Sequence, residues 1–303
     1  MTPPVQSEAA ADVGARCLAL GTAQFGQSYG VANTSGQVPA AAVAAITTLA
    51  REHGIDTLDT AVAYGDSEAV LGAAGVASWR VVSKLPPLPA DTTDVGGWVQ
   101  RQVSGSLQRL RIERLDGLLL HNPADAYGAR GQQLLRALAV LKAGNSIGAA
   151  GISIYDPTEL EALWPEWRPD IVQAPCSVLD RRLLHSGWLT RLQEAGTRLH
   201  VRSIFLQGLL LMPAARRPPY FARWRSLLDR WLEWCRAQAV APLAAALAFA
   251  RTLPGVERVV VGVDSCAQLR ALLEAARCGA LPPPDDLCST ERELLEPWRW
   301  RAT

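Results

Sequence analysis

The chain has 303 residues, a formal net charge of +1, 49% hydrophobic residues and 19% charged residues. This composition supports a large core and excludes global disorder. The near-neutral charge gives no general attraction to nucleic acid or to a membrane. Among 30 basic residues only Lys84 and Lys142 are lysines. The abundance of Ala, Gly and Pro points to GC-rich coding, which explains the bias toward arginine but not why these two lysines remain.

The amino-terminal segment and the cysteines favour a cytoplasmic protein. Residues 1–15 hold no basic residue and no apolar run, so they are predicted to form a flexible segment rather than a signal peptide. The apolar stretch Ala237–Ala250 is interrupted by Pro242 and is too short to cross a bilayer. The six cysteines form no C-x-x-C pair, which is typical of reduced, mostly buried thiols rather than of a zinc site or a disulfide framework.

Strand-like runs alternate with amphipathic helical runs along nearly the whole chain. Strands are predicted at 17–22, 57–60, 81–84, 117–121, 148–154, 171–175, 199–204 and 256–263. Helices are predicted at 40–52, 67–74, 95–110, 131–143, 158–163, 188–194, 221–238, 242–253 and 266–277. Val99, Val103 and Leu107, at steps of four, illustrate the helical spacing.

Eight strands, each followed by a helix, predict an α/β fold: a single-domain (β/α)8 TIM barrel over residues 16–280. The strands are continuous apolar runs, as expected for a parallel sheet covered on both faces. A doubly wound open sheet is the alternative, but the glycines of 21–30 do not have the G-x-G-x-x-G spacing that it would need. Residues 281–303 are predicted to form a tail that packs on or near the barrel mouth.

Four polar residues are predicted near the carboxyl ends of consecutive strands, where barrel enzymes carry their chemistry. Asp59, Lys84 and His121 end strands two, three and four, and Tyr64 follows strand two. Each has a structural alternative: a helix cap for Asp59, a surface position for Lys84, a hydrogen-bonded role for His121 and loop packing for Tyr64. Their joint placement on neighbouring strands favours one shared site.

These groups suit the transfer of a proton to a carbonyl oxygen. A nearby ammonium is expected to lower the pKa of a phenol toward the working range. An ion pair with Asp59 would keep Lys84 charged in a closed site, and a histidine donor can hold the carbonyl oxygen. No side chain delivers hydride, so the reaction would need a nicotinamide or a flavin.

Two segments resemble the aldo-keto reductase family. Residues 57–68, TLDTAVAYGDSE, are similar to the signature segment of the family, and residues 20–26, LGTAQFG, are similar to its opening strand and turn. The resemblance covers about residues 16–280. It implies that Asp59, Tyr64, Lys84 and His121 are the catalytic tetrad, with Tyr64 as the general acid.

The resemblance also implies an NADPH site, and no metal is expected. Ser153 and Gln173 match the clamp on the nicotinamide carboxamide, although Ile154 stands where Asn is usual. Arg202 lies where an aromatic ring commonly stacks on the nicotinamide, and a guanidinium can also stack on a ring. The implied cofactor contacts are Gly21, Thr22, Ser153, Gln173, Arg202, Ser203, Phe205, Leu206, Gly208, Gly262, Ser265 and Gln268.

Asp264 is unexpected beside the 2′-phosphate of NADPH, because two negative charges repel. Arg258 or Arg270 would have to compensate for it, and NADH is therefore the alternative cofactor.

The expected reaction is the reduction of an aldehyde or ketone, including a sugar or a natural-product intermediate, to an alcohol. Arg216 and Arg217 are hypothesised to bind an anionic substrate. Trp298 or Trp300 either walls the site or packs as an ordinary terminus. The alternatives are a non-catalytic cofactor-binding scaffold or regulatory subunit, and a sugar dehydrogenase working in the oxidative direction. We expect a monomer or weak homo-oligomer with a small-molecule carbonyl substrate, and neither nucleic acid nor membrane as partner.

Overall fold

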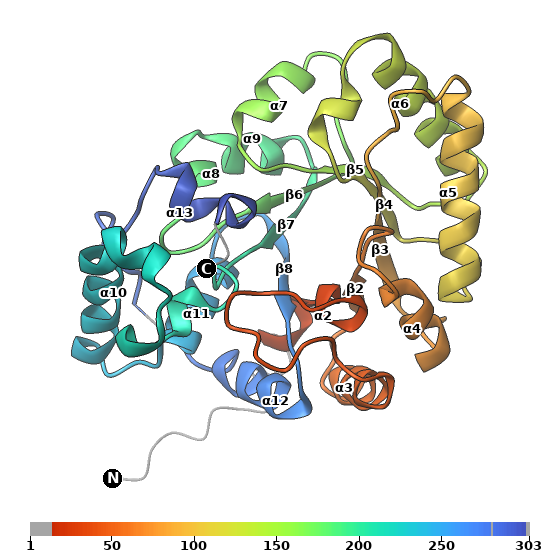
Figure 1. Cartoon of the computed structure of the whole chain (residues 1–303). Coiled ribbons are helices and arrows are strands. Elements are labelled where there is room, and N and C mark those ends of the chain that lie inside the picture. Colours follow the sequence, from red (N-terminus) through yellow and green to blue (C-terminus); the bar gives the residue numbers. More distant parts are fainter. Residues whose placement is uncertain (1–13, 280, 301–303) are drawn as a thin grey trace.

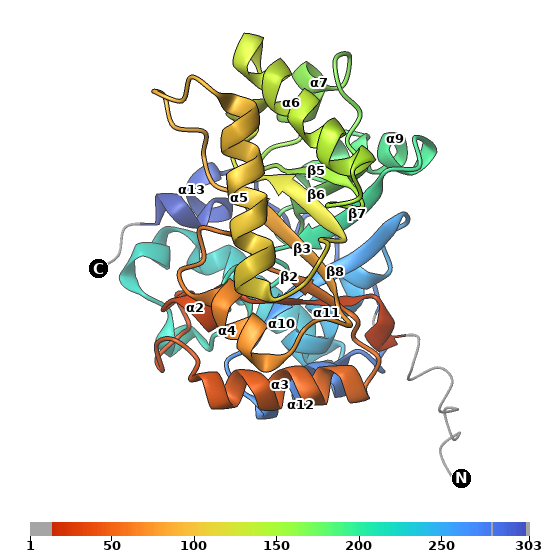
Figure 2. The same cartoon turned by 90° about the vertical axis from the view of Figure 1, so that its right-hand side faces the viewer.

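The computed structural model describes residues 14–279 and 281–300. Eight parallel strands close into a barrel in chain order, and pairing of the first strand with the last completes the ring. Helices cover the ring from outside (Figure 1), as the view turned by 90° also shows (Figure 2). The predicted single-domain (β/α)8 barrel is therefore confirmed.

The strands of the ring are β1 (Leu18–Gly21), β2 (Thr57–Asp59), β3 (Arg80–Leu85), β4 (Gly117–Leu120), β5 (Ala150–Ser153), β6 (Ile171–Pro175), β7 (Arg198–Arg202) and β8 (Val256–Gly262). The helices are α2 (Ala23–Gly26), α3 (Ala40–Glu52), α4 (Ser67–Ala74), α5 (Val95–Leu110), α6 (Gly128–Ala143), α7 (Thr158–Leu163), α8 (Arg182–His185), α9 (Trp188–Glu194), α10 (Arg225–Ala237), α11 (Pro242–Arg251), α12 (Cys266–Ala275) and α13 (Arg292–Leu295).

Periodicity located the longer elements well. Helices α3, α4, α5, α7 and α9 and strand β6 have the predicted bounds. The predicted helix 221–238 is in fact a 3-10 turn, η4 (Pro219–Trp224), followed by α10. Pro219 is the first residue of this turn, where its missing N–H costs no hydrogen bond.

The inner face of the barrel is layered. Side chains alternate along a strand, so Arg80, Val82 and Lys84 of β3 share one face. Val82 packs with Leu119, Ala149 and Ile171 in an apolar cluster that is separate from the core under the helices. This cluster lies between a charged layer at the amino ends of the strands and a polar layer at their carboxyl ends.

The cysteines and the amino-terminal segment only partly match expectation. All six cysteines are free, but only Cys176 and Cys235 are buried, so the prediction of mostly buried thiols is wrong. Cys266 and Cys278, for example, lie at or beyond the ends of α12, on the surface side of the barrel. The segment predicted to be flexible lies outside the described residues except for Gly14 and Ala15, and Ala15 is buried. No helix within the described ranges is long and apolar enough to cross a membrane.

The described part of the tail lies against the carboxyl end of the barrel. Glu296 is fully buried and accepts hydrogen bonds from Arg182, Arg292 and Arg299. Its neighbour Trp298 places its ring 4.2 Å from the ring of Tyr155, which follows β5. The ion pairs of Glu296 therefore anchor an aromatic side chain beside the barrel mouth.

Candidate active site

Asp59 and Lys84 form a buried ion pair at the carboxyl ends of β2 and β3. Lys84 Nζ donates to Asp59 Oδ1 at 2.7 Å and to the Thr60 carbonyl oxygen at 2.9 Å. The Lys84 side chain is 1% exposed. Burial lowers the pKa of the Lys84 ammonium, and the Asp59 carboxylate opposes that shift. The site thus pairs its only buried lysine with a fixed counter-charge.

Tyr64 and His121 lie next to this pair. The Tyr64 ring is 5.7 Å from the His121 ring, edge to face at 83°, and its centroid is 5.1 Å from Lys84 Nζ. All four residues that the sequence assigned to a tetrad therefore meet at one end of the barrel.

The pKa of Tyr64 differs from the sequence-based expectation. Burial raises it well above its usual value, and the negative charge of Asp59 adds to the effect. The expected lowering of the Tyr64 pKa is therefore wrong, because burial of the phenol is the largest effect on it. The phenol therefore keeps its proton at neutral pH until a reaction removes it.

His121 is held in its neutral form. Burial lowers the pKa of His121 to about 4, and the positive charges of Lys84 and Arg202 push it the same way. At neutral pH the ring is an uncharged imidazole, which can donate one N–H hydrogen bond.

Two glycines allow the Tyr64 turn to sit where it does. Gly65 has φ of 52°, which favours glycine. A Cβ on Gly26 would overlap the Tyr64 carbonyl oxygen, and one on Gly65 would overlap the Gly26 carbonyl oxygen. The loop after β1 therefore packs directly against the turn that carries the phenol. The contact brings together residues 20–26 and 57–68, the two segments that resemble the family.

A chain of hydrogen bonds links the tetrad to the predicted nicotinamide clamp. Gln173 Nε2 donates to Asp59 Oδ2 at 2.6 Å, and Ser153 Oγ donates to Gln173 Oε1 at 3.3 Å. All three side chains are buried. Sequence spacing gave no signal of this link, because β2 and β6 are far apart in the chain and meet only across the barrel.

The first predicted cofactor contacts lie where β1 meets its neighbours. Gly21 is in register with Asp59 on β2 and with Gly262 on β8. Thr22 donates its hydroxyl hydrogen to the Asp59 carbonyl oxygen at 3.0 Å. Thr22 therefore also stabilises the backbone at the tetrad.

The loop after β7 has a tightly wound backbone and holds four more of the predicted contacts, Ser203, Phe205, Leu206 and Gly208. Ser203, Leu206, Gln207 and Gly208 have φ of 60°, 46°, 53° and 90°. Gln207 fixes the loop to the segment after β1, since its carbonyl and side-chain oxygens accept from Ala32 and Val31 N–H groups. Within the described residues, the N–H groups of 203–205 donate no hydrogen bond to protein. Backbone donors gathered in such turns favour an anion.

The remaining contacts lie at the start of α12. Ser265 Oγ accepts from Gln268 N–H at 3.2 Å, and Gln268 Oε1 accepts from Asp264 N–H at 2.7 Å. Asp264 Oδ1 is buried without a donor in the described part of the chain. Burial raises the pKa of Asp264.

Two arginines do not lie where the sequence-based hypotheses need them. Arg258 binds Thr57 at 3.0 Å and Asp56 at 3.3 Å at the amino ends of the strands, so it cannot compensate Asp264. Arg217 is paired with Asp229 at 2.6 Å, and its side chain is 7% exposed. This pairing neutralises Arg217 and removes it as a receptor for a substrate anion.

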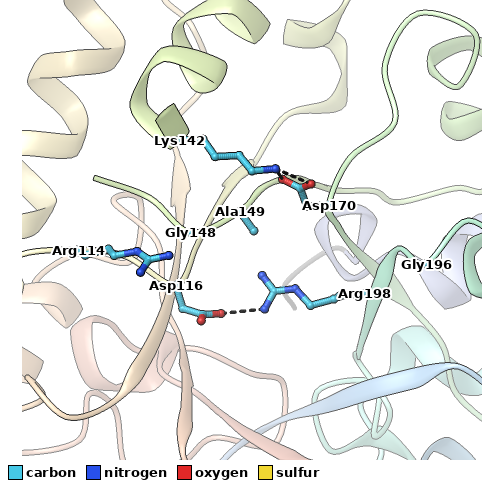
Figure 3. A pocket seen from close by; sticks show the side chains of 8 residues that line it. All are labelled: Arg114, Asp116, Lys142, Gly148, Ala149, Asp170, Gly196 and Arg198. Carbon is cyan, nitrogen blue, oxygen red and sulfur yellow. Dashed lines mark hydrogen bonds and ion pairs between the residues drawn. The ribbon is translucent and has the colours of Figure 1, made fainter. Parts of the chain in front are cut away.

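A surface hollow of about 470 Å³ opens at the amino ends of the strands (Figure 3). Four of the five charged residues that line it are paired: Lys142 binds Asp170 at 2.7 Å, and Arg198 binds Asp116 at 3.0 Å. It lies at the end of the barrel opposite the tetrad. Residues 14–279 and 281–300 contain no cluster of side chains that could hold a metal ion.

Comparisons with known proteins agree with this architecture. A Pseudomonas aeruginosa protein described as an aldo-keto reductase is 24% identical, with a TM-score of 0.64 over 86% of this chain and 89% of that one. The aldo-keto reductase AKR11C1 from Bacillus halodurans, in its holo form, is 22% identical, with a TM-score of 0.70 over 89% of each chain. At these identities the likeness shows the fold. No curated protein matches the sequence. The model of the aldo/keto reductase family matches residues 17–285, and the chain therefore belongs to that family.

Proposed function

We propose that the protein reduces an aldehyde or ketone to an alcohol with NADPH as hydride donor. The observation that carries this proposal is the cluster of a buried Asp59–Lys84 pair, a protonated phenol and a neutral imidazole at one end of the barrel. Membership of the family implies NAD(P)H-dependent oxidoreductase chemistry. The six free thiols support a reducing, cytoplasmic setting.

Tyr64 is the proposed general acid. Its raised pKa keeps the proton on the phenol, so the group enters the reaction in its donor form. As the phenol loses its proton to a carbonyl oxygen, negative charge develops on a side chain whose ring centre lies 5.1 Å from the Lys84 ammonium. The neutral His121 N–H stabilises the same developing charge without competing for the proton.

Lys84 and Asp59 act as a fixed electrostatic unit. Asp59 keeps the buried ammonium charged against the effect of burial, and Gln173 occupies the second carboxylate oxygen. The ammonium is thereby held in place before the reaction, which avoids the cost of reorganising solvent during it.

The residues proposed to hold the nicotinamide cofactor fit a dinucleotide. The unused N–H groups of 203–205 and the wound backbone that follows them suit a pyrophosphate. Ser153 and Gln173 offer amide and hydroxyl groups for a carboxamide, and Ser265 and Gln268 lie at the α12 amino terminus. When bound, the nicotinamide would supply the hydride that no side chain can supply.

The test is NADPH oxidation over a panel of aldehydes and ketones, with Tyr64→Phe as the key variant. We expect turnover by the wild-type protein and a loss of at least about 10³-fold in kcat for the variant. Titration of tryptophan fluorescence with NADPH and with NADH should show that Tyr64→Phe still binds cofactor. Cofactor binding without turnover on any carbonyl would contradict the proposal and favour a scaffold role.

A further inference from the structure

Arg202 is an arginine without a carboxylate partner at the catalytic end of the barrel. Its Nη2 donates to the Ile154 carbonyl oxygen at 2.9 Å and its Nη1 to Ser203 Oγ at 3.2 Å. Neither acceptor is charged, and within residues 14–279 and 281–300 Arg202 forms no ion pair. By contrast, Arg182 and Arg217, in the same half of the barrel, each bind carboxylates.

The charge of Arg202 acts on the reacting groups. It lowers the pKa of His121, and it opposes the burial-driven rise in the pKa of Tyr64. It also adds to the lowering of the pKa of Lys84. Asp59 already balances Lys84 through a direct ion pair. The Arg202 charge also acts on Glu159, whose carboxylate accepts from the Tyr155 and Asp156 N–H groups instead of pairing with the guanidinium.

Arg202 also has donors to spare. A guanidinium carries five N–H groups in one plane. The bonds to Ile154 and Ser203 use two of them, which leaves three without an acceptor in the described chain. A planar fork with free N–H groups is the geometry that binds carboxylate or phosphate oxygens with two parallel hydrogen bonds.

The surroundings of Arg202 fix the side from which a ligand can approach. The guanidinium carbon lies 5.1 Å from the centre of the Tyr155 ring, so that ring covers one face. Tyr155 packs on Trp298, which is 52% exposed although Glu296 anchors the tail around it. Arg202 is half-buried, so protein does not enclose its guanidinium on all sides.

We propose that Arg202 recognises an anionic group, a carboxylate or a phosphate, on the carbonyl substrate. This assignment rests on the proposed reductase function and names the class of substrate that the site prefers. The open face of the guanidinium can serve the nicotinamide contact expected from the sequence, while its free N–H groups serve the anion. The substrate then places its carbonyl at Tyr64 and its anion at Arg202.

The experiment compares matched carbonyl pairs. The pairs are 4-carboxybenzaldehyde with benzaldehyde, and glyceraldehyde 3-phosphate with glyceraldehyde, so that the two arms separate carboxylate from phosphate. The variants are Arg202→Gln, which removes the charge, and Arg202→Lys, which keeps it. Arg191→Gln is the control, because Arg191 also lies over an aromatic ring, at 3.8 Å from Trp188, but is paired with Glu161 outside the barrel mouth.

We expect the wild-type protein to prefer the charged member of at least one pair by tenfold or more in kcat/KM, an effect of about 1.4 kcal/mol. At saturating NADPH, Arg202→Gln should abolish that preference, chiefly through a higher KM, because kcat/KM should fall at least about tenfold more for the charged member of the pair than for the uncharged member. Arg202→Lys should retain part of the preference, and Arg191→Gln all of it.

Equal losses on charged and uncharged substrates would overturn the proposal and assign Arg202 to the cofactor, while the reductase function would stand. If no carbonyl were turned over, the reductase function would fail separately. Calorimetric titration with 4-carboxybenzyl alcohol and benzyl alcohol, in the presence of NADP⁺, would then test whether Arg202 recognises an anion. Tighter binding of the carboxylate by wild type than by Arg202→Gln supports anion recognition, and equal binding contradicts it.

Discussion

The two ends of the barrel use the same residue types in opposite ways. At the amino ends of the strands, Glu257 lies within 4 Å of Arg80, Arg198, His200 and Arg258. These charges compensate one another. At the carboxyl ends, Arg202 keeps free donors and Asp264 keeps a buried oxygen without a donor. Paired charges stabilise the fold, whereas unused hydrogen-bonding capacity is what a ligand can exploit.

Single strands contribute to both ends. Arg198, His200 and Arg202 alternate along β7, with the first two in the charged network and the third beside the tetrad. The position of a residue along its strand, rather than its type, therefore decides whether it stabilises or binds. The hollow in Figure 3 lies at the amino ends of the strands, whereas barrel enzymes carry their chemistry at the carboxyl ends.

The two lysines give the largest expected contrast between the ends. Lys84→Arg should lower kcat by about 10³-fold, roughly 4 kcal/mol, because the wide guanidinium cannot replace a compact ammonium between Asp59 and the Tyr64 ring. Lys142→Arg should change kcat little, since Lys142 is half exposed and binds Asp170 at the other end. The measurement is steady-state kinetics, with circular dichroism to verify folding. Near-normal turnover in Lys84→Arg would mean that the surviving lysine is coincidental.

Gly26→Ala should disturb the carboxyl end of the barrel without removing any of the four side chains of the proposed tetrad. The new Cβ would overlap the Tyr64 carbonyl oxygen, so either the loop after β1 or the Tyr64 turn must move. Overpacking of this kind costs about 1–3 kcal/mol, and we expect loss of both stability and kcat. Gly36→Ala is the control, because nothing lies within 4 Å of its Cβ position and only the backbone at φ 76° is strained. A variant Gly26→Ala with unchanged kcat would show that the turn position is not critical.

Glu257→Gln should disturb the other end, with loss of stability and little change in kcat. Burial alone would raise the pKa of Glu257, but the hydrogen bond to His200 and the neighbouring cations lower it to about 2. The carboxylate therefore contributes stability at pH 7, and that contribution is lost as the pH falls from about 4.5 through about 2. We expect the variant to lose about 1–3 kcal/mol at neutral pH, allowing for solvent screening.

Urea denaturation of wild type and Glu257→Gln at pH 7, 4 and 3 measures the difference between their free energies of unfolding. This difference in unfolding free energy should be constant down to about pH 4.5 and should then become smaller. A difference that becomes larger at low pH would contradict the assignment of the charged network to stability.

The sequence predicts the barrel because each strand and helix carries its own periodicity. It also predicts that Asp59, Tyr64, Lys84 and His121 lie together, because they follow consecutive strands, and the structure brings them together. Sequence reasoning failed where partners are distant in the chain. The sequence did not show that Arg258 and Arg217 already have partners. Arg258, on β8, pairs with Asp56, and Arg217, in the loop after β7, pairs with Asp229. The Gln173–Asp59 bond depends on the closure of the barrel. Local patterns predict which residues end a strand, but not which charges are already paired.

Substitution of Asp264 gives the smallest expected effect, and it tests which nicotinamide cofactor the start of α12 favours. If a 2′-phosphate binds beside α12, the Asp264 carboxylate repels it. Arg258 lies at the other end of the barrel and cannot offset that charge, which leaves the exposed Arg270 of α12 as the residue that could. Asp264→Asn should therefore tighten NADPH binding by about tenfold, or 1.4 kcal/mol, and change NADH binding much less. The measurement is tryptophan fluorescence titration with both cofactors, with Asp170→Asn, at the opposite end, as the control. If Asp264→Asn weakened NADH binding and left NADPH binding unchanged, the Asp264 oxygen that has no donor would instead accept from a ribose hydroxyl. The wild-type protein would then be the form that favours NADH.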